Sequence, residues 1–290
     1  MAVTSFFSAF IVYKHISFIS FTGILQNLPK NFTTVLSVVK FCSILCEIIT
    51  ISGGIHMSIV SDIEKLKKEK NAVILAHYYV DEDVQDVADY IGDSFYLSKV
   101  ATKVSQDRII FAGVEFMGES AKILNPKKRV FMPDMNADCP MAHMADKDEI
   151  LALREKYDDL AVVCYINSTA ELKKYSDVCV TSSNAVKIVK NLPNKNIFFI
   201  PDRNLGSYVA KQCPDKNFIF NNGCCPRHVV ITKDMVLKAK ELHPEARFAA
   251  HPECTEDVLA FADYVGSTSG IIDYVVDTDA DEYIIGTVDG

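Results

Sequence analysis

The sequence lacks three features that would each indicate a familiar class of protein: an excess of positive charge, a long uninterrupted apolar run and a Cys-x-x-Cys pair. Its 30 Lys and Arg face 38 Asp and Glu, a formal net charge of −8, so electrostatics argue against a nucleic-acid partner. The 290 residues suffice for one large domain or for two to three small ones.

The cysteines do not fit a disulfide scaffold, because there are only nine in the chain and the number is odd. No signal peptide is evident, so we expect a cytoplasmic protein with reduced thiols. Metal binding is then the better use for any special cysteine. For Cys164 and Cys179, which lie in apolar runs, we expect only small buried hydrophobic side chains.

Residues 1–56 differ in composition from the rest of the chain. Their firm charges are Lys14, Lys30, Lys40 and Glu47. These charges interrupt both apolar runs before about 18 residues, the length of a membrane span, and no positive charge precedes the first run as in a signal peptide. We expect an atypical extension outside the fold, translated from upstream DNA, with Met57 as the true start. A membrane-associating leader is the alternative.

From Met57 onward the pattern is orderly. Ser61 and Glu64 form a predicted capping box that opens a short charged helix. Short apolar runs then alternate with helical stretches, which is typical of α/β units with parallel sheets. The predicted strands are 72–76, 108–113, 129–133, 160–166, 177–181, 196–201, 217–220, 247–250, 263–266 and 283–287.

Polar residues or glycines follow or end many of these runs, where open α/β sheets bind their ligands. They are His77, Gly113, Asp134, Asn167, Ser182, Asp202, Gly223 and His251.

The chain also repeats itself with a period of about 87 residues. Blocks that begin ILAHYY, VVCYIN and FAAHPE each place a hydroxyl group 17 residues on: His77 to Ser94, Tyr165 to Ser182 and His251 to Thr268. Cys139 and Cys225 are 86 residues apart (225 − 139). We therefore predict three pseudo-symmetric α/β domains at 57–150, 151–240 and 241–290, each a small parallel sheet flanked by helices. Because the period places a third cysteine near 311 (225 + 86), we expect the third domain to be truncated.

The segment FIFNNGCCPRH, residues 218–228, places Cys224 and Cys225 side by side after an apolar run. Related domains that each present one thiolate would suit an iron–sulfur cluster with one open iron. Zinc bound by three thiolates is the rival interpretation, and buried structural thiols are a third. Spacing alone does not choose between them.

Several motifs resemble the quinolinate synthase family, the A protein of bacterial NAD biosynthesis. They are ILAHYY, QDVADYIGDSFYLSKVA, NADCPMA, CYINSTAELK, TSSNA, GCCPRH, HPEC and GSTSGI, and the resemblance runs from about Met57 to Gly290. It implies three pseudo-symmetric α/β domains around a [4Fe–4S] cluster held by one cysteine from each. It also implies a transferase-type condensation of iminoaspartate with dihydroxyacetone phosphate to quinolinate, phosphate and water. Aspartate oxidase would be a functional partner, with no nucleic-acid or membrane partner.

The resemblance assigns Cys139 and Cys225 as cluster ligands, while the third cluster cysteine is not present in this chain. Cys225 matches the family's Cys-x-x-His, with Cys224 as the alternative if the local register slips. Cys254 is expected to be structural. His143 departs from the acidic residue usual in the family after DCPMA, which puts the surroundings of Cys139 in doubt.

The other site residues implied by the resemblance are polar groups at strand and helix ends. His77, Tyr79 and Glu253 are expected to be catalytic, with Glu253 as the general base. The expected substrate-binding residues are His77, Ser94, Tyr165, Asn167, Ser182, His251, Glu253, Ser267 and Thr268. The Ser and Thr residues would bind substrate anions at helix N-termini, and the same residues are also common helix caps.

Three other functions compete with this one. The first is an inactive truncated member of the family, the second is a different iron–sulfur hydro-lyase, and the third is a non-catalytic anion-binding protein. Substitution of Cys139 by Ser separates the enzymes, which would lose iron and activity, from a binding protein, which would keep its ligand affinity.

Overall fold

The computed structural model describes residues 10–13, 59–134 and 136–288. Residues 59–70 are helical, and because this helix already includes residues 59 and 60, Ser61 lies inside it. The predicted capping box is therefore wrong. Glu64 instead accepts a hydrogen bond from Lys67 Nζ at 2.6 Å, a pairing along the helix surface. Within the described part of the chain, no helix combines the length and apolar character needed to cross a bilayer.

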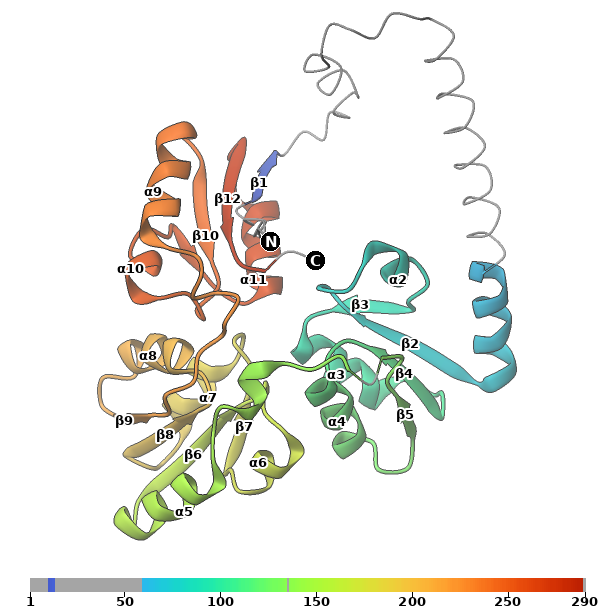
Figure 1. Cartoon of the computed structure of the whole chain (residues 1–290), viewed down its shortest axis with the longest axis horizontal. Helices are drawn as coiled ribbons and strands as arrows, with labels where there is room; N and C mark the ends of the chain where they lie inside the picture. The colour runs from blue at the N-terminus through green and yellow to red at the C-terminus, as the bar shows by residue number, and fades with distance from the viewer. Residues whose placement is uncertain (1–9, 14–58, 135, 289–290) are drawn as a thin grey trace, which may run out of the picture. The chain divides into compact units, whose positions relative to one another are not determined.

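The first sheet has four parallel strands in the order β3-β2-β4-β5 (Figure 1). Helices lie between successive strands, so each connection is a β–α–β crossover. The strands are β2 (Ala72–His77), β3 (Tyr90–Gly92), β4 (Arg108–Ala112) and β5 (Arg129–Phe131). The helices are α2 (Glu82–Asp86), α3 (Ser94–Lys103) and α4 (Glu115–Leu124).

The second sheet repeats this topology in the order β7-β6-β8-β9, again with parallel strands. Its strands are β6 (Leu160–Tyr165), β7 (Val178–Val180), β8 (Asn196–Ile200) and β9 (Asn217–Phe220). Its helices are α6 (Ala170–Lys174), α7 (Ala185–Asn191) and α8 (Arg203–Gln212). A 3₁₀ helix, Pro140–His143, and α5 (Lys147–Lys156) connect the first sheet to the second.

The third sheet begins in the same way, with parallel strands in the order β11-β10-β12. Its strands are β10 (Arg247–Ala250), β11 (Tyr264–Val265) and β12 (Glu282–Gly286), and its helices are α9 (Lys233–Leu242), α10 (Glu256–Leu259) and α11 (Thr268–Asp277). β1 (Phe10–Tyr13) pairs antiparallel with β12, at the position that β5 and β9 occupy in the other sheets. The rest of the segment 1–56 lies outside the described residues.

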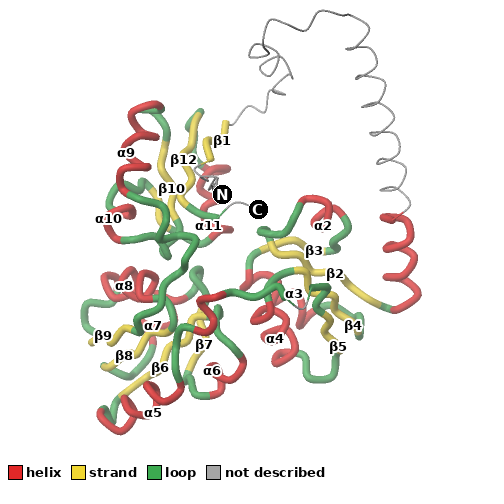
Figure 2. Tube along the Cα trace, viewed as in Figure 1, coloured by secondary structure: helices red, strands yellow, loops and turns green. Residues whose placement is uncertain are grey.

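The predicted fold class is confirmed, and each of the ten predicted strands corresponds to an observed one. Figure 2 shows the three sheets as separate groups of strands with helices around them. The sequence prediction missed two strands. β1 lies in the segment that we expected to be outside the fold, so this expectation is wrong for residues 10–13. β3 is a three-residue strand with two exposed residues and therefore has no long apolar run. Helices α5 and α9 span the domain boundaries expected at 150 and 240.

One aspartate in each domain fixes the same corner of the repeat. The carboxylate accepts a hydrogen bond from a backbone N–H of the central strand at 2.7–2.8 Å, and in each case the two residues are 15 apart. The three pairs are Asp89 with Ile74, Asp177 with Val162 and Asp263 with Phe248. Each aspartate also donates its own N–H to the carbonyl of the same strand residue. In each sheet, the strand that follows this aspartate is therefore positioned beside the central strand by the same pair of hydrogen bonds.

The core consists of the central strands and the helices that cover them. All six residues of β6 are buried, and so are five of the six in β2, as expected for parallel strands covered on both faces. Cys139 packs against the apolar cores of both the first and the second domain. The loop that carries this cysteine is therefore held between two of the repeats.

Candidate active site

The central strands of the three sheets, β2, β6 and β10, end at or next to His77, Tyr165 and His251, and all three side chains line one cavity of about 570 Å³. This is the edge at which open α/β sheets bind ligands. The cavity also brings together most of the predicted site residues. Eleven of the twelve line it: His77, Tyr79, Ser94, Cys139, Tyr165, Asn167, Ser182, Cys225, His251, Glu253 and Thr268.

The hydroxyl residues take different places at their helices. Ser267 is the one predicted residue that does not line the cavity; it is the N-cap of α11 and accepts a hydrogen bond from Gly270 N at 3.3 Å. Ser94 and Thr268 are the first residues of α3 and α11. Ser182 lies in the turn that precedes α7, which begins at Ala185. Ser267 thus has the capping role, and the other three hydroxyl residues line the cavity.

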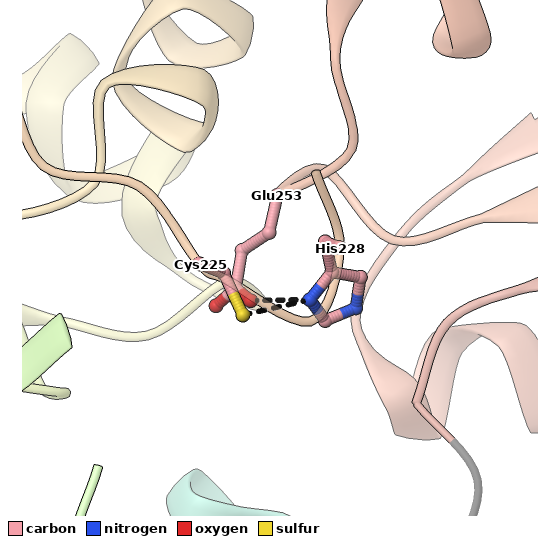
Figure 3. A group of neighbouring side chains, drawn as sticks. All are labelled: Cys225, His228 and Glu253. Carbon is pink, nitrogen blue, oxygen red and sulfur yellow. Dashed lines mark hydrogen bonds and ion pairs between the residues drawn. The ribbon is translucent and has the colours of Figure 1, made fainter. Parts of the chain in front are cut away.

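Cys225, His228 and Glu253 form a compact buried group at the cavity (Figure 3). His228 Nδ1 lies 2.7 Å from Glu253 Oε2 and 3.1 Å from Cys225 Sγ. One ligand atom from each residue falls within 4.8 Å of the other two, so the group has the donor chemistry to hold a metal ion.

Hydrogen bonds extend this group across the three domains. Tyr165 OH donates to Glu253 Oε1 at 2.6 Å, and His228 Nε2 lies 3.0 Å from Thr287 Oγ1. Tyr79 OH lies 3.3 Å from the same threonine hydroxyl and 2.9 Å from Thr268 Oγ1. A hydroxyl, an imidazole and a carboxylate are thereby connected in sequence. This arrangement allows a proton to move between a tyrosine or threonine oxygen and the glutamate.

His77 and His251 are held as neutral imidazoles. In each, Nδ1 accepts a hydrogen bond from the backbone N–H two residues on, at 3.2 Å from Tyr79 N and 3.4 Å from Glu253 N. The neutral ring then carries its proton on Nε2. Burial lowers the pKa of both histidines to about 4, against smaller opposing effects of Asp93 on His77 and of Glu253 on His251. At neutral pH both rings are therefore hydrogen-bond donors without charge.

Glu253 is held as an anion. Burial by itself would raise the pKa of this carboxyl, but the neighbouring His228 and His251 and the hydrogen bonds from His228 and Tyr165 outweigh burial and lower it. The opposite holds for Asp202, whose pKa is raised to about 8 by burial and then by the charge of Glu253. Asp202 accepts hydrogen bonds from Leu205 N at 2.8 Å and Cys225 N at 3.0 Å, so it holds the cysteine loop against α8.

The two predicted ligand thiols share one electrostatic property. Burial is the largest cause that raises the pKa of both Cys139 and Cys225, and the charge of Glu253 adds to it in both cases. A bound metal deprotonates a thiol outright, so these surroundings suit a cationic group at the cavity. Cys224 is half-buried and does not line the cavity. Cys254 is buried and its thiol donates to Gly286 O at 3.4 Å.

Four residues of the site were missed by the sequence analysis. His228 was visible in the CPRH string, and Asp202 had been noted only as a strand end. Thr287 directly follows β12, which is the same signal that found His77. Arg227 is the only Lys or Arg among the described residues that line the cavity, and its position in a loop gave no sign of this.

His143 is half of a local pair. Its Nε2 lies 2.7 Å from Asp138 Oδ2, in the loop that carries Cys139. The departure from the family pattern at this position therefore places a histidine beside an acidic residue of the same loop.

Three domains whose parallel strands converge on one cavity with buried acid–base groups and thiols are typical of an α/β enzyme, and one group at this cavity has the donor chemistry to hold a metal ion. The profile of the family NadA, quinolinate synthetase A protein, matches residues 61–290, and the chain belongs to this family. A quinolinate synthase of Fusobacterium nucleatum is 61% identical over 228 residues, covering 79% of this chain and 76% of that protein. Quinolinate synthases of Caldicellulosiruptor saccharolyticus and Clostridioides difficile are 54% and 50% identical, each covering 75% of the relative and 78% and 79% of this chain.

Proposed function

We propose that the chain catalyses the quinolinate synthase reaction, in which iminoaspartate and dihydroxyacetone phosphate condense to quinolinate, phosphate and water. One observation carries the proposal: eleven predicted site residues from three domains line a single cavity in a chain of this family. Iminoaspartate would come from aspartate oxidase, which is the functional partner. The proposed setting is the cytoplasm, as the reduced cysteines suggest.

Cys139 and Cys225 are the residues that would hold a [4Fe–4S] cluster in the cavity. The donor chemistry fits, because both thiols line the cavity and burial leaves each in need of a cationic partner to become a thiolate. The described residues supply two of the three thiolates that the family resemblance implies. When bound, such a cluster supplies an open iron that acts as a Lewis acid on a substrate oxygen.

Glu253 is the proposed general base. It is buried and anionic, and Tyr165 and His228 hold one carboxylate oxygen each. The proton it takes can pass to His228, whose Nε2 lies beside the Thr287 hydroxyl. Tyr79, at the other side of that hydroxyl, is placed to give or take a proton at a substrate oxygen.

The substrates are anions, and the cavity offers separate groups to receive them. Ser94 and Thr268 begin ten-residue helices, whose free N–H groups and dipoles favour negative charge. Asn167 and Ser182 contribute neutral hydrogen-bond groups from the second domain. Arg227 adds the positive charge that a phosphate or a carboxylate favours. His77 and His251, as neutral donors, suit a developing oxyanion.

A single bound metal ion is the second candidate for the site, because Cys225, His228 and Glu253 already lie within ligand distance of one another. Zinc accepts this donor set. The two proposals differ in their use of Cys139, which is a ligand only for the cluster. Metal analysis of Cys139→Ser therefore separates them: iron and sulfide are lost with the cluster, whereas zinc bound by the other three residues is retained.

The test of function starts from protein purified without oxygen and reconstituted with iron and sulfide. Aspartate oxidase then generates iminoaspartate in the presence of dihydroxyacetone phosphate, and quinolinate is identified by mass. We expect quinolinate from the wild type and none from Cys139→Ser. Iron-loaded wild type that forms no quinolinate but dehydrates another hydroxy acid would identify the hydro-lyase instead. Unchanged anion binding by Cys139→Ser, with no turnover in either protein, would identify a binding protein.

A further inference from the structure

Cys164 and Cys179 lie opposite each other on neighbouring parallel strands. They are direct register partners in the pairing of β6 with β7. Paired strands are about 4.8 Å apart, which lies within the Cα separation of about 4.4–6.8 Å that a disulfide spans. The two thiols also contact each other. The backbone and the side chains thus both place these sulfur atoms for bond formation.

The two cysteines differ in their access to solvent. We expected both to be buried, and the prediction is wrong for Cys179. Cys164 is fully buried in the core of the second domain, whereas Cys179 is exposed. β7 is an edge strand of its sheet, whereas β6 lies between β7 and β8. A dissolved reagent can therefore reach one thiol of the pair and not the other.

The surroundings of the pair favour a thiolate on Cys164. A hydrogen bond with Cys179 is the largest cause that lowers the pKa of Cys164, to about 7, whereas the same hydrogen bond, followed by burial, raises the pKa of Cys179. The ammonium group of Lys173 acts on both sulfur atoms, and it is held in place by Ser120 Oγ at 2.8 Å and Phe116 O at 3.2 Å. After loss of the first proton from the pair, the remaining proton therefore lies on Cys179 and is shared with the Cys164 sulfur. A nearby cation and a lowered pKa are the conditions under which cysteines exchange with disulfides.

We propose that Cys164 and Cys179 form a redox-active dithiol that low-molecular-weight disulfides convert to an intrachain disulfide. The pair first loses one proton to solvent. The Cys179 sulfur then attacks one sulfur of the reagent while its proton passes to Cys164, so that a mixed disulfide forms and one reagent thiolate is released. Cys164 gives this proton to the released thiolate, attacks Cys179 Sγ and releases the second reagent thiolate, which takes up a proton from solvent. Overall, two protein thiols lose two electrons and two protons, and one small disulfide becomes two small thiols.

The position of the pair connects it to the cavity without making it part of the cavity. Neither sulfur lines the cavity, but Tyr165 follows Cys164 directly, and Thr181, Ser182 and Ser183 follow β7. A bond between the two strands would therefore act on the segments that carry these lining residues. The modification itself goes beyond the proposed function and does not depend on it.

The test is peptide mapping after anaerobic treatment of the folded protein with oxidised glutathione, followed by alkylation and digestion with trypsin. Cleavage at Lys156, Lys173, Lys174 and Lys187 leaves the two cysteines on separate peptides, 157–173 and 175–187. We expect these peptides to be joined by a disulfide in the wild type and in the control Cys213→Ser, whose missing thiol is a buried one elsewhere.

Two variants test the order of attack. In Cys164→Ser, Cys179 should stop as the glutathione mixed disulfide, and in Cys179→Ser, Cys164 should stay unmodified because it is buried. A wild-type protein that stops at the mixed disulfide on Cys179, or that keeps both cysteines alkylatable, overturns the proposal. The readout needs no activity, so failure of the proposed function would leave it unaffected.

Discussion

The first and second domains share one frame but hold their predicted ligand cysteines, Cys139 and Cys225, differently. In both, an aspartate accepts a hydrogen bond from the central strand. In both, a lysine ammonium group also donates to two backbone carbonyls, which are those of Ala101 and Val104 for Lys128 and those of Leu192 and Asn194 for Lys216. Cys225 is buried, its N–H bonds to Asp202 and its sulfur contacts His228. Cys139 is only partly buried, and its N–H bonds to the adjacent Asp138.

The contacts that both domains share hold the sheets together, whereas the contacts that differ lie around the side chains proposed to carry the chemistry. The position two residues after the strand-end His or Tyr is Tyr79 in the first domain, Asn167 in the second and Glu253 in the third. Only the third offers a carboxylate, and residues of the second domain orient it. Equivalent places in the fold thus carry different roles.

The largest expected effect follows from removing the carboxylate of Glu253, which is replaced by Tyr79 and Asn167 at the equivalent positions of the other two domains. We expect Glu253→Gln to lower the rate of quinolinate formation by about 10²–10⁴-fold, the usual contribution of a general base. Tyr165→Phe removes one hydrogen bond to the same group and should have a smaller effect. Rates are compared at equal iron content. A Glu253→Gln protein with the wild-type rate would contradict the assignment of the base.

The second prediction concerns pH and the two buried neutral histidines. Their folded pKa of about 4 lies below the unfolded value of 6.5, so the unfolded state binds more protons between these limits and stability falls as pH falls from 6.5 to 4. Asp202, whose pKa is raised to about 8, binds a proton in the folded state over this range and releases it on unfolding. It therefore cancels the pH dependence that one of the two histidines contributes. The net dependence is then about one proton, or roughly 1.4 kcal/mol per pH unit.

Urea unfolding at a series of pH values checks this slope. His77→Gln should remove most of the net slope, since one neutral histidine and Asp202 then remain in opposition. The control is His243→Gln, at a histidine outside the cavity that pairs with Glu282. An unchanged slope in His77→Gln would show that His77 is not held neutral.

The third prediction compares the two cysteine loops directly. Asp202→Asn weakens the hydrogen bond to Cys225 N, and loss of such a supporting group typically costs about 10–100-fold in metal affinity. Asp138→Asn is the matched change beside Cys139, where the carboxylate is exposed, and we expect a smaller loss. Chelator-induced iron release measures both. Equal losses would remove the distinction between the loops.

The smallest expected effect is on the frame itself. Asp89→Ala removes the carboxylate that accepts from Ile74 N, and a hydrogen bond of this kind contributes about 1 kcal/mol to stability. Asp177→Ala removes the equivalent hydrogen bond from Val162 N, together with the pairing of Asp177 with Arg154 at 2.8 Å, and should also lower stability. Urea unfolding measures the change, and neither variant should alter the rate of the reaction per folded molecule.

The strands and the strand-end residues were predictable from sequence because both follow from local pattern. A buried parallel strand needs an apolar run, and the residue after it lies at the ligand-binding edge, so His77, Asn167 and His251 were found together. Tyr165 was found through the repeat. The repeat then placed Cys139 and Cys225 in corresponding loops. Contacts between distant residues give no such pattern. Thr287 and His228 are 59 residues apart and meet only because their domains do.

The sequence also did not reveal whether a side chain on an edge strand is buried or exposed. Cys164 and Cys179 lie in similar apolar runs, yet β6 is covered on both sides while β7 has one neighbour. Likewise, β3 is too short and too exposed to produce a hydrophobic signal. In each case the missing information was which strand lies at the edge of its sheet, a property of topology rather than of the local residues.

The hydrogen bond between Tyr165 and Glu253 can form only late in the synthesis of the chain. The two residues are separated by 88 positions, and the ribosome adds about 5–20 residues per second, so the tyrosine waits on the order of ten seconds for its partner. During that interval the first domain can fold and the second is completed, while the Tyr165 hydroxyl has no carboxylate to bind. The growing chain therefore acquires its frame before it acquires its acid–base chemistry.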